Sequence, residues 1–391
     1  MINSRRSIFY HTGIKTMKHT LKKNGYIPYI PSLILILFFI CGISGCLSAS
    51  QGTGSAGSPN PGVTDQTVTI TDSLNRTVTL MGYPQRIVAA NQVVLDYLIL
   101  LGAGGSVVGV PEFELENKAL MGYLPNATGI GGSVANINCE QIVALKPDLV
   151  IAFAKYPPKA DALLNSTHIP EVYFNNFDSP DEDDEVLELG RLVGNEKKAE
   201  EYVRFTNSSM AAIQSRLSAT SGKKPRVYVE YLTDYMTYGG GSRLDRIVTF
   251  LHADNIAHNV SADYPTISSE WIIEQDPDII IKLVSGISLR DNTTTLKDAH
   301  SGLVTRPGFS NLSAVRNHRV YVINYDMLST TRQVPGMLYL AKMFYPAEFS
   351  DIDPYAVLNE SAYRFQPGID HISTVYPPVS VLPVAGQAGS G

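Results

Sequence analysis

The chain has 391 residues, 44% hydrophobic and 17% charged, a composition typical of a globular protein with room for two domains and appendages. The formal net charge of −6, without a Lys/Arg run that carries interleaved aromatic residues, argues against a nucleic-acid-binding surface. The sequence has neither a G-x-S-x-G elbow nor an H-E-x-x-H pair, so we expect a protein that is not an enzyme.

Residues 1–46 have the features of a signal peptide with a lipobox. Lysines between residues 18 and 23 precede an apolar run from Leu33 to Ile43, which suits a signal-peptide core and is short for a membrane-spanning helix. The run ends in Ile-Ser-Gly-Cys, which resembles a lipobox, so Cys46 is expected to be lipidated and to become the new N-terminus. The alternative is a leader retained as an anchor. Both place the rest of the chain on the outer side of the cell membrane.

The cysteines and the sequons agree with a location on the outer side of the cell membrane. Loss of Cys41 with the leader and lipidation of Cys46 leave Cys139, which we expect to be a small buried residue in the first turn of a helix. Asn-x-Ser/Thr sequons are more frequent than the composition gives by chance, and glycosylation of an exported protein would explain the excess, with a polar composition bias as the alternative. They lie at Asn75, Asn126, Asn165, Asn207, Asn259, Asn292, Asn311 and Asn359.

The first part of the mature chain predicts a tether and then an α/β lobe. Residues 47–66 are rich in Gly, Ser and Pro without an apolar period, which indicates a flexible tether. The alternating run over 67–80, with a turn at Asn75, predicts a β-hairpin. Apolar strands interleaved with helices then indicate a parallel sheet covered on both faces, in a lobe over 67–194. We expect strands at 86–90, 107–110, 148–152 and 171–174, and helices at 92–102 and 139–145.

A long helix is predicted next, followed by a second α/β lobe. Residues 182–219 favour helix with a break at Gly194-Asn195, and the piece over 195–220 is expected to join the lobes. The alternation then begins again in a C-terminal lobe over 221–375, before a disordered tail over 376–391. In this lobe we expect strands at 226–231, 278–283 and 319–324, and helices at 243–253, 270–275 and 336–345.

One phrase occurs twice, a domain's length apart: CEQIVALKPDLVIA from Cys139 and SEWIIEQDPDIIIK from Ser269. Each copy predicts a short helix with an N-cap residue, a carboxylate in the first turn (Glu140 or Glu270) and a Pro-Asp pair that ends the helix before a strand. The two lobes should therefore carry equivalent helices. On spacing alone, stabilisation of the helix dipole by about 0.3–1 kcal/mol is a sufficient reason for the two carboxylates.

The chain resembles the substrate-binding proteins of ABC importers for iron–siderophore complexes, haem and cobalamin. In that family, two rigid lobes joined by a long helix hold the ligand in a cleft between them, and a glutamate on each lobe docks against arginines of the permease. Those glutamates map onto Glu140 and Glu270. The resemblance covers residues 67–349 and is carried by DSLNRTVTL, QRIVAANQVVLDYLILLGAGGSVVGV, NCEQIVALKPDLVIA, GGGSRLDRIVTFLHADNIA, SSEWIIEQDPDIII and NLSAVRNHRVYVIN.

The resemblance implies an α/β protein of two lobes with mostly parallel sheets, a single long helix between them and a ligand cleft. It also implies a function. A lipid-anchored, monomeric receptor would capture a metal chelate, without a cofactor of its own, and deliver it to a permease dimer with its ATPase subunits. Arg–carboxylate pairing at both lobes would suit a two-fold permease.

Candidate ligand residues follow from the rule that parallel α/β sheets bind ligands beyond the carboxyl ends of their strands. Aromatic side chains there could stack on a macrocycle or a catecholate, while Lys155 and Arg332 could neutralise an anionic chelate. The candidates are Asn91, Gln92, Glu112, Phe113, Lys155 and Tyr156 in the first lobe and Tyr235, Met236, Tyr238, Tyr325 and Arg332 in the second, with Asn175, Asn176 and Phe177 as weaker ones.

A bare metal ion is the main alternative ligand, and it would need several His and carboxylate groups converging in the cleft. The family's metal-ion-binding members have a histidine soon after the first strand, where this chain has Asn91. His252 and His258 are six residues apart and do not share a helix face, so no metal site is predicted. A solute receptor that feeds no transporter and a lipid-anchored hydrolase are further alternatives, of which the hydrolase lacks a recognisable nucleophile or metal-ligand motif.

Overall fold

The computed structural model describes residues 67–90, 92–131, 137–155, 166–175, 182–285, 293–329, 331–365 and 375–376. All of them belong to one unit of the chain, Val63–Gly391. The leader with Cys46, the tether and the candidates Asn91, Tyr156, Asn176 and Phe177 lie outside the described residues. Within the described ranges, no helix is both long enough and apolar enough to cross a membrane.

The fold starts with the antiparallel hairpin that the sequence predicts, formed by β1 (Thr67–Thr71) and β2 (Thr77–Met81). Asn75 occupies the turn with a φ of 58°. The buried carboxylate of Asp72 accepts hydrogen bonds from the backbone N–H groups of Leu74 and Arg76, both at 3.0 Å, and pairs with the guanidinium of Arg76. Because one side chain satisfies both backbone donors, the turn is held in a single shape.

Two five-stranded sheets follow, and the α/β class is confirmed. The first has the order β5-β4-β3-β6-β7 and is parallel, with β3 (Ile87–Ala89), β4 (Val107–Val110), β5 (Thr128–Gly129), β6 (Leu149–Phe153) and β7 (Glu171–Phe174). The second has the order β12-β11-β10-β8-β9, with β8 (Arg226–Glu230), β9 (Asp254–Asn255), β10 (Ile279–Val284) and β11 (Val320–Asn324) parallel. In this sheet β12 (Val375–Tyr376) runs antiparallel to β11, and its Tyr376, expected in the tail, pairs with Val322.

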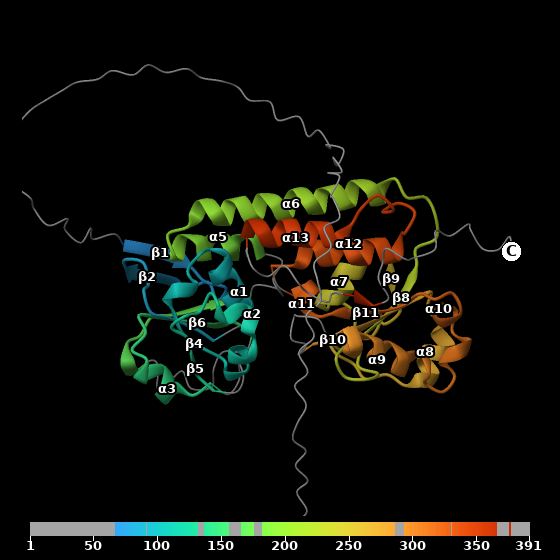
Figure 1. The fold of residues 1–391 in the computed structure, drawn as a ribbon, viewed down its shortest axis with the longest axis horizontal. Helices are drawn as coiled ribbons and strands as arrows, with labels where there is room; N and C mark the ends of the chain where they lie inside the picture. Colours follow the sequence, from blue (N-terminus) through green and yellow to red (C-terminus); the bar gives the residue numbers. More distant parts are fainter. Residues whose placement is uncertain are drawn as a thin grey trace, which may run out of the picture. The chain divides into compact units, whose positions relative to one another are not determined.

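The helices cover both faces of the sheets (Figure 1). The sequence did not predict α9 or α13, nor the short elements α2, α10 and α11. The helices are α1 (Gln92–Leu100), α2 (Lys118–Met121), α3 (Cys139–Ala144), α5 (Glu182–Leu192), α6 (Glu196–Ser218), α7 (Arg243–Phe250), α8 (Ser269–Gln275), α9 (Thr293–Val304), α10 (Ser313–Arg316), α11 (Asp326–Ser329), α12 (Gln333–Phe344) and α13 (Pro354–Phe365), with 3₁₀ turns at Gly104–Ser106, Glu112–Glu116 and Phe309–Asn311.

Alternate residues of the strands enter different cores, as expected for strands buried on both faces. In β3, Ile87 and Ala89 join the main core, whereas Val88 joins a smaller core with Ile142 of α3. In β10, Ile279, Ile281 and Leu283 join the main core, whereas Ile280 joins a second small core with Ile272 of α8. The two lobes are therefore built alike, with α3 and α8 on equivalent faces.

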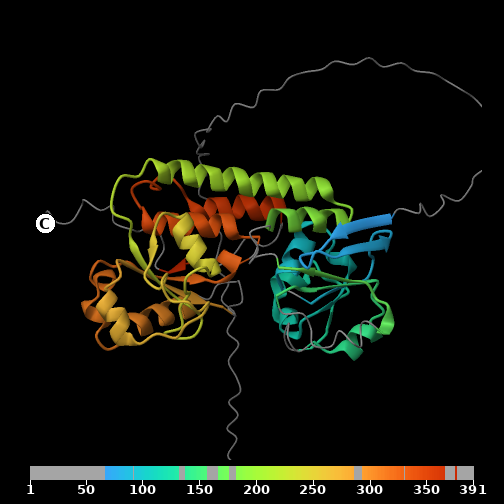
Figure 2. The same ribbon diagram turned by 180° about the vertical axis from the view of Figure 1, so that it is seen from behind.

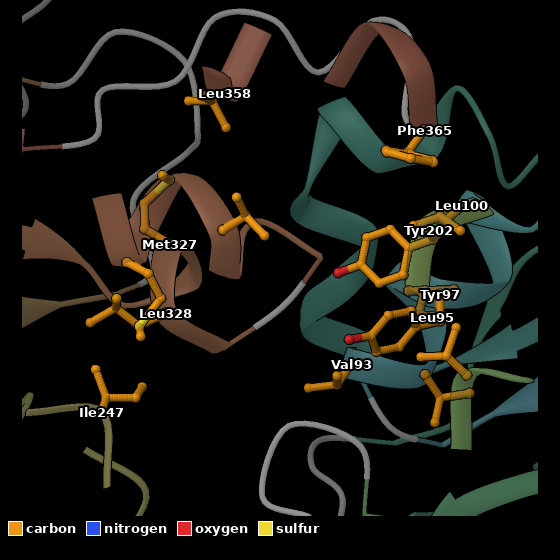
Figure 3. Close-up of a cluster of buried hydrophobic side chains, with 14 of the residues drawn as sticks. Val93, Leu95, Tyr97, Leu100, Tyr202, Ile247, Met327, Leu328, Leu358 and Phe365 are labelled. Atoms are coloured by element: carbon orange, nitrogen blue, oxygen red, sulfur yellow. The ribbon is translucent and has the colours of Figure 1, made fainter. Parts of the chain in front are cut away.

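The main core is continuous between the lobes and includes one face of α6. This 23-residue helix passes above both sheets, and α13 lies alongside it (Figures 1 and 2). Tyr202 of α6 makes edge contacts with Tyr97 of α1 and Phe365 of α13, at ring-centroid distances of 5.8 and 5.3 Å (Figure 3). Arg364 of α13 also pairs with Glu201 at 3.0 Å. The connection between the lobes is thus reinforced by packing along α6 as well as by the covalent chain.

A buried ionic network fixes the loop that follows β8. The carboxylate of Glu230 is fully buried and is held at two points by Arg306, at 2.6 and 2.9 Å, and by Lys282 at 2.8 Å. It also accepts hydrogen bonds from the hydroxyl of Tyr228 and the backbone N–H of Tyr235. Since these partners come from two strands and two loops, one carboxylate orders the carboxyl end of the second sheet.

We predict that Glu230→Ala strongly destabilises the fold, because it leaves the charges of Lys282 and Arg306 without their buried partner. The expected loss in the free energy of unfolding is about 3–5 kcal/mol, measured by urea denaturation. The control is Glu200→Ala, whose ion pair with Arg204 is exposed, with an N–O distance of 3.4 Å. That loss should stay below about 1 kcal/mol. Equal losses for the two variants would contradict the structural role given to Glu230.

Candidate functional site: the cleft between the lobes

A cleft with a volume of about 360 Å³ lies between the two lobes, with walls from both. The first lobe contributes the β1–β2 turn and the loops that follow β6 and β7, and the second contributes the start of α7 and the loop over 258–264. These loops lie beyond the carboxyl ends of strands, where open α/β sheets bind ligands. The lining residues are Leu74, Ala154, Lys155, Asn175, Gly241, Ser242, Arg243, Arg246, Asp263 and Tyr264.

The glycines before α7 allow the second wall of the cleft to form. A Cβ atom on Gly239 would lie 1.9 Å from the carbonyl oxygen of Ala262, and one on Gly240 would lie 2.0 Å from that of His258. The N–H of Gly240 donates to the carbonyl of Val260 at 3.0 Å. Because only glycine permits this close approach, the loop that carries Asp263 is fixed directly onto the start of α7.

The buried carboxylate of Asp245 holds the same region from within α7. It accepts hydrogen bonds from the backbone N–H of Gly241 at 2.9 Å and from the side-chain amide of Asn255 at 2.9 Å. Nδ1 of His258 lies 3.0 Å from it. The side chain of Asp245 therefore ties the helix start to β9 and to the loop over 258–264, which keeps the cleft wall in one arrangement.

Among the described residues that line the cleft, three side chains are cationic and one is a carboxylate. Arg243 and Arg246 are three residues apart on α7 and so share a helix face. Arg243 is buried and lies near Glu182, whose pKa is raised by burial while the charge of Arg243 opposes the shift. Lys155 of the first lobe pairs across the cleft with Asp263 of the second, with an N–O distance of 3.7 Å.

Four tyrosines form a cluster at the same edge of the second sheet. Tyr231 has ring-centroid distances of 5.3, 5.4 and 5.8 Å to Tyr238, Tyr264 and Tyr325. Tyr264 also lines the cleft and is 39% exposed, whereas Tyr238 is 1% exposed and has its pKa raised by burial. The buried Tyr238 therefore packs against Tyr231 and Tyr264, and Tyr264 carries the aromatic surface into the cleft.

A second cavity of about 220 Å³ adjoins the cleft, because Arg243 and Arg246 line both. Its other walls come from α5, α6, α7 and α12 and are largely apolar. They consist of Glu182, Met210, Ile247, Phe250, Gln333 and Met337.

The structure brings together some of the predicted ligand residues and separates others. Lys155 and the weaker candidate Asn175 line the cleft, and Tyr238 and Tyr325 belong to the adjoining tyrosine cluster. Among the described candidates, six belong neither to the lining nor to the tyrosine cluster. They are Gln92, Glu112, Phe113, Tyr235, Met236 and Arg332.

The first-lobe candidates lie on nearby elements. Gln92 is a half-buried residue at the start of α1. Glu112 and Phe113 are exposed at the start of a 3₁₀ turn, and the carboxylate of Glu112 lies so close to Gly129 that a Cβ atom there would clash with it.

The second-lobe candidates have structural partners. Tyr235 has a φ of 62°, and its ring lies under the guanidinium of Arg306, with 4.5 Å between the ring centroid and Cζ. Met236 forms an isolated β-bridge with Thr266. Arg332 is buried and pairs with Asp96 of α1 at 3.0 Å, so it joins the two lobes instead of lining the cleft.

Sequence reasoning missed the arginines of the cleft. Arg243 and Arg246 belong to the segment GGGSRLDR, which was used for the family resemblance but not for the ligand site. The available signal was a glycine turn, the N-cap Ser242 and two arginines at helix spacing after a strand. Tyr231, Asp263 and Tyr264 carried no comparable local signal. Leu74 was missed as well, although it lies in a turn that the sequence predicts.

The duplicated helices α3 and α8 have the predicted form. The side chains of Asn138 and Ser268 accept hydrogen bonds from the N–H groups of Gln141 and Trp271, both at 3.2 Å. Glu140 and Glu270 are both exposed. The pKa of Glu270 is lowered, chiefly by its own backbone N–H and also by Ser268 and Ser269.

The far ends of these helices are also equivalent. Arg86, directly before β3, donates to the carbonyl of Leu145 at 2.6 Å, and Arg226 at the start of β8 donates to that of Gln275. The C-termini of α3 and α8 are thereby fixed at the amino ends of strands, so their N-termini point toward the carboxyl ends, where the cleft lies.

Across the described residues, no three His, Cys, Asp or Glu side chains are grouped so that they could hold a metal ion. His258 contacts Asp245, while His168 and His318 precede β7 and β11 and have φ values of 58° and 55°.

Comparison with known proteins gives the family. A model of the periplasmic binding protein family matches residues 87–326. The chain belongs to the periplasmic binding protein family. A cobalamin-binding protein of Halobacterium salinarum is 30% identical over 287 residues, which cover 71% of this chain and 74% of that protein.

Two further similarities agree with this family. The ABC transporter substrate-binding lipoprotein YvrC of Bacillus subtilis is 28% identical over 293 residues, covering 73% of this chain and 87% of that protein. The names of both relatives describe solute-binding proteins. The crystal structure of the TroA-like periplasmic binding protein FepB from Veillonella parvula superposes with a TM-score of 0.66 at 23% identity, covering 77% of this chain and 96% of that one. This likeness shows the fold.

A buried acidic cluster surrounds Arg332 where the lobes meet. Asp96 and Glu114 come from the first lobe and Asp326 from the second, and the first two are almost fully buried. Burial raises the pKa of Glu114 to about 8, with further raising by Asp96 and Asp326 and an opposing effect of Arg332. Burial also raises the pKa of Asp326. One arginine therefore faces three carboxyl groups, and the pKa of Glu114 lies above neutral pH, so this carboxyl keeps its proton there.

We predict that Glu114 makes the fold less stable as the pH rises from about 5 to about 8. In this range folded Glu114 keeps a proton that the unfolded chain, with an ordinary pKa of 4.5, has lost. The free energy of unfolding therefore falls by up to about 1.4 kcal/mol per pH unit. Glu114→Gln should reduce this slope in urea denaturation series, whereas the exposed Glu116→Gln should leave it unchanged. An unchanged slope in Glu114→Gln would contradict the protonated state of Glu114.

Proposed function

We propose that this protein is an extracytoplasmic, lipid-anchored receptor that captures a metal chelate, such as a ferric siderophore, haem or a cobalamin, and delivers it to an ABC importer. The observation that carries the proposal is the interlobe cleft, whose walls combine cationic side chains with an exposed tyrosine. Its volume of about 360 Å³ falls within the range of about 300–1,000 Å³ that is usual for small-molecule sites.

Several features support a chelate as the cargo. Tyrosine rings offer flat apolar surface to the organic part of a chelate, while lysine and arginine can donate to its oxygen atoms. Membership of the periplasmic binding protein family and the similarity to a cobalamin-binding protein agree with this class of cargo. The chain itself would hold no resident cofactor, since the metal arrives and leaves with the chelate.

The exposed glutamates at the starts of α3 and α8 support delivery to a permease. Each lobe presents one carboxylate on an equivalent helix, on the face of its sheet away from α6 (Figures 1 and 2). A permease with two-fold symmetry could pair one arginine-bearing surface with each lobe of a single receptor molecule. The leader and Cys46 would supply membrane attachment, as the name of the lipoprotein YvrC also suggests.

We predict that the double substitution Glu140→Ala and Glu270→Ala abolishes uptake of the cargo and leaves its binding unchanged, because the two carboxylates lie outside the cleft. Uptake would be measured in cells with a radiolabelled chelate, and binding by calorimetry. The matched control is the double substitution Glu116→Ala and Glu274→Ala at two other exposed acidic positions. Normal uptake with the first pair would instead favour a receptor that is not coupled to transport.

A thermal-shift panel tests the cargo class. The probes are ferric catecholate, ferric hydroxamate and ferric citrate complexes, haem, cyanocobalamin and free divalent metal ions. A ligand present at about 100 times its Kd stabilises the folded state by about 2.7 kcal/mol, which gives a measurable rise in Tm. A rise with at least one chelate is expected. A rise with free metal ions alone would exclude the proposal.

A further inference from the structure

We propose that the folded chain receives N-linked glycans on three asparagines in surface turns, Asn75, Asn126 and Asn259. Each is the first residue of an Asn-x-Ser/Thr sequon, the acceptor motif for this modification. The chain has more sequons than its composition gives by chance, and the proposed function leaves this excess unexplained. The inference depends on the extracytoplasmic location of the chain and not on the identity of its cargo.

The three turn sequons are exposed at both of the positions that a transferase recognises. Asn75 lies in the β1–β2 turn, Asn126 in the loop between α2 and β5, and Asn259 in the turn after β9. All three asparagine side chains are exposed, and so are the hydroxyl residues two positions later in the chain. Acceptor sequons of exported proteins lie in surface loops, so these three have the required context. The hydroxyl residues are Thr77, Thr128 and Ser261.

The sequon at Asn359 of α13 has the opposite environment. Asn359 is half-buried, its Oδ1 atom is buried, and the hydroxyl residue of its sequon, Ser361, is only 5% exposed. A transferase that acts on the folded chain cannot reach this hydroxyl group. We therefore expect Asn359 to stay unmodified, and it provides a reference within the same chain.

Two further described sequons have an exposed asparagine but a hydroxyl group that is engaged in the fold. Ser209, in the sequon of Asn207, donates to a backbone carbonyl one helical turn earlier, at 2.8 Å. Ser313, in the sequon of Asn311, donates to the carboxylate of Asp276 at 2.7 Å. A transferase would have to break these hydrogen bonds to recognise the hydroxyl groups. The proposal is therefore limited to the three turns.

The modification is a glycosyl transfer from an oligosaccharide that is carried on a polyprenyl phosphate. The amide nitrogen Nδ2 of asparagine forms a bond to C1 of the first sugar, and the bond between C1 and the phosphate oxygen breaks. The lipid phosphate leaves with that electron pair, and the amide nitrogen loses one proton to a base of the transferase. One N–H remains, so the hydrogen bond from Nδ2 of Asn126 to the carbonyl of Gly105, at 2.9 Å, can persist.

The positions of the three sites suit a receptor that works outside the cell. Asn75 directly follows the cleft residue Leu74, and Asn259 belongs to the loop that carries Tyr264, so one glycan would lie beside the cleft on each lobe. Exposed loop tips are preferred sites of proteolysis, and a bulky sugar protects them. Neither α3 nor α8 contains a sequon, so the helices proposed to meet the permease carry no glycan of their own.

The experiment is peptide mapping by mass spectrometry of the full chain, produced in its own organism and purified from the membrane fraction. We expect the peptides that contain Asn75, Asn126 and Asn259 to carry one oligosaccharide each. The peptides that contain Asn359 and Asn317, an exposed asparagine outside any sequon, should have their unmodified masses. A glycan on Asn359 with the three turns bare would overturn the inference.

Substitutions at the hydroxyl positions link each increase in mass to its own sequon. Thr77→Ala, Thr128→Ala and Ser261→Ala keep the asparagine, and each should remove the glycan from its own site alone. The matched control Thr77→Ser preserves the sequon and should keep the glycan. An increase in mass at Asn75 that persists in Thr77→Ala would be a different modification and would contradict the proposal.

A protease added to intact cells separates this inference from the proposed function. Glycans on the three turns would support both. If the protease cleaves the chain and the three asparagines are bare, the inference fails and the proposed function stands. If the chain is protected from the protease and bare, the extracytoplasmic location is wrong, and the proposed function fails together with the inference.

Discussion

Burial of both faces of each parallel sheet is the constraint on which the rest of the structure depends. Because alternate residues of β3 and β10 enter separate cores, each strand needs helices on either side of it. The crossover connections that this requires leave the loops at the carboxyl ends as the places where side chains can vary freely. The cleft is built from those loops, while α3 and α8 cover the faces that lie away from the long helix α6. One packing requirement thus sets both the loops that line the cleft and the helices that carry Glu140 and Glu270.

The cationic side chains of the cleft are held in place by groups that do not line the cleft themselves. Arg246 lies in the first turns of α7, and the start of this helix is ordered by the carboxylate of Asp245. The glycines before α7 add to this order, because they let the loop over 258–264 pack closely on the start of the helix and they donate backbone hydrogen bonds to it. The tyrosine cluster is supported in the same way, since the loop after β8 is tied to the buried Glu230. Like charges that lie close together in a cleft repel one another and destabilise the folded state. The hydrogen bonds of the buried carboxylates of Asp245 and Glu230 oppose this repulsion and keep the surrounding loops ordered.

The sequence predicts a feature of this molecule well when that feature depends on contacts between residues that are close together in the chain. Apolar strands, helix spacings and the repeated phrase at Cys139 and Ser269 are local, and the two lobes, the long helix and the capped helices follow from them. The role of Arg332 is not local, because its partner Asp96 lies 236 positions away in the chain. The arginines of α7 reach the cleft only through the way the loop over 258–264 packs on Gly239 and Gly240. Strand-end rules nominate loops that line the cleft, but they do not tell which loop residues turn inward.

Two ionic contacts between the lobes differ in burial, and this difference bears on how the receptor responds to cargo. Asp96 and Arg332 are buried, so separating them would leave charges uncompensated in the interior, at a cost of about 3–5 kcal/mol. Lys155 and Asp263 are partly exposed, and such a pair contributes about 1 kcal/mol or less. The continuous core along α6 adjoins the buried contact between Asp96 and Arg332. An adjustment between the lobes is therefore least costly at the Lys155–Asp263 contact, while the packing along α6 stays intact.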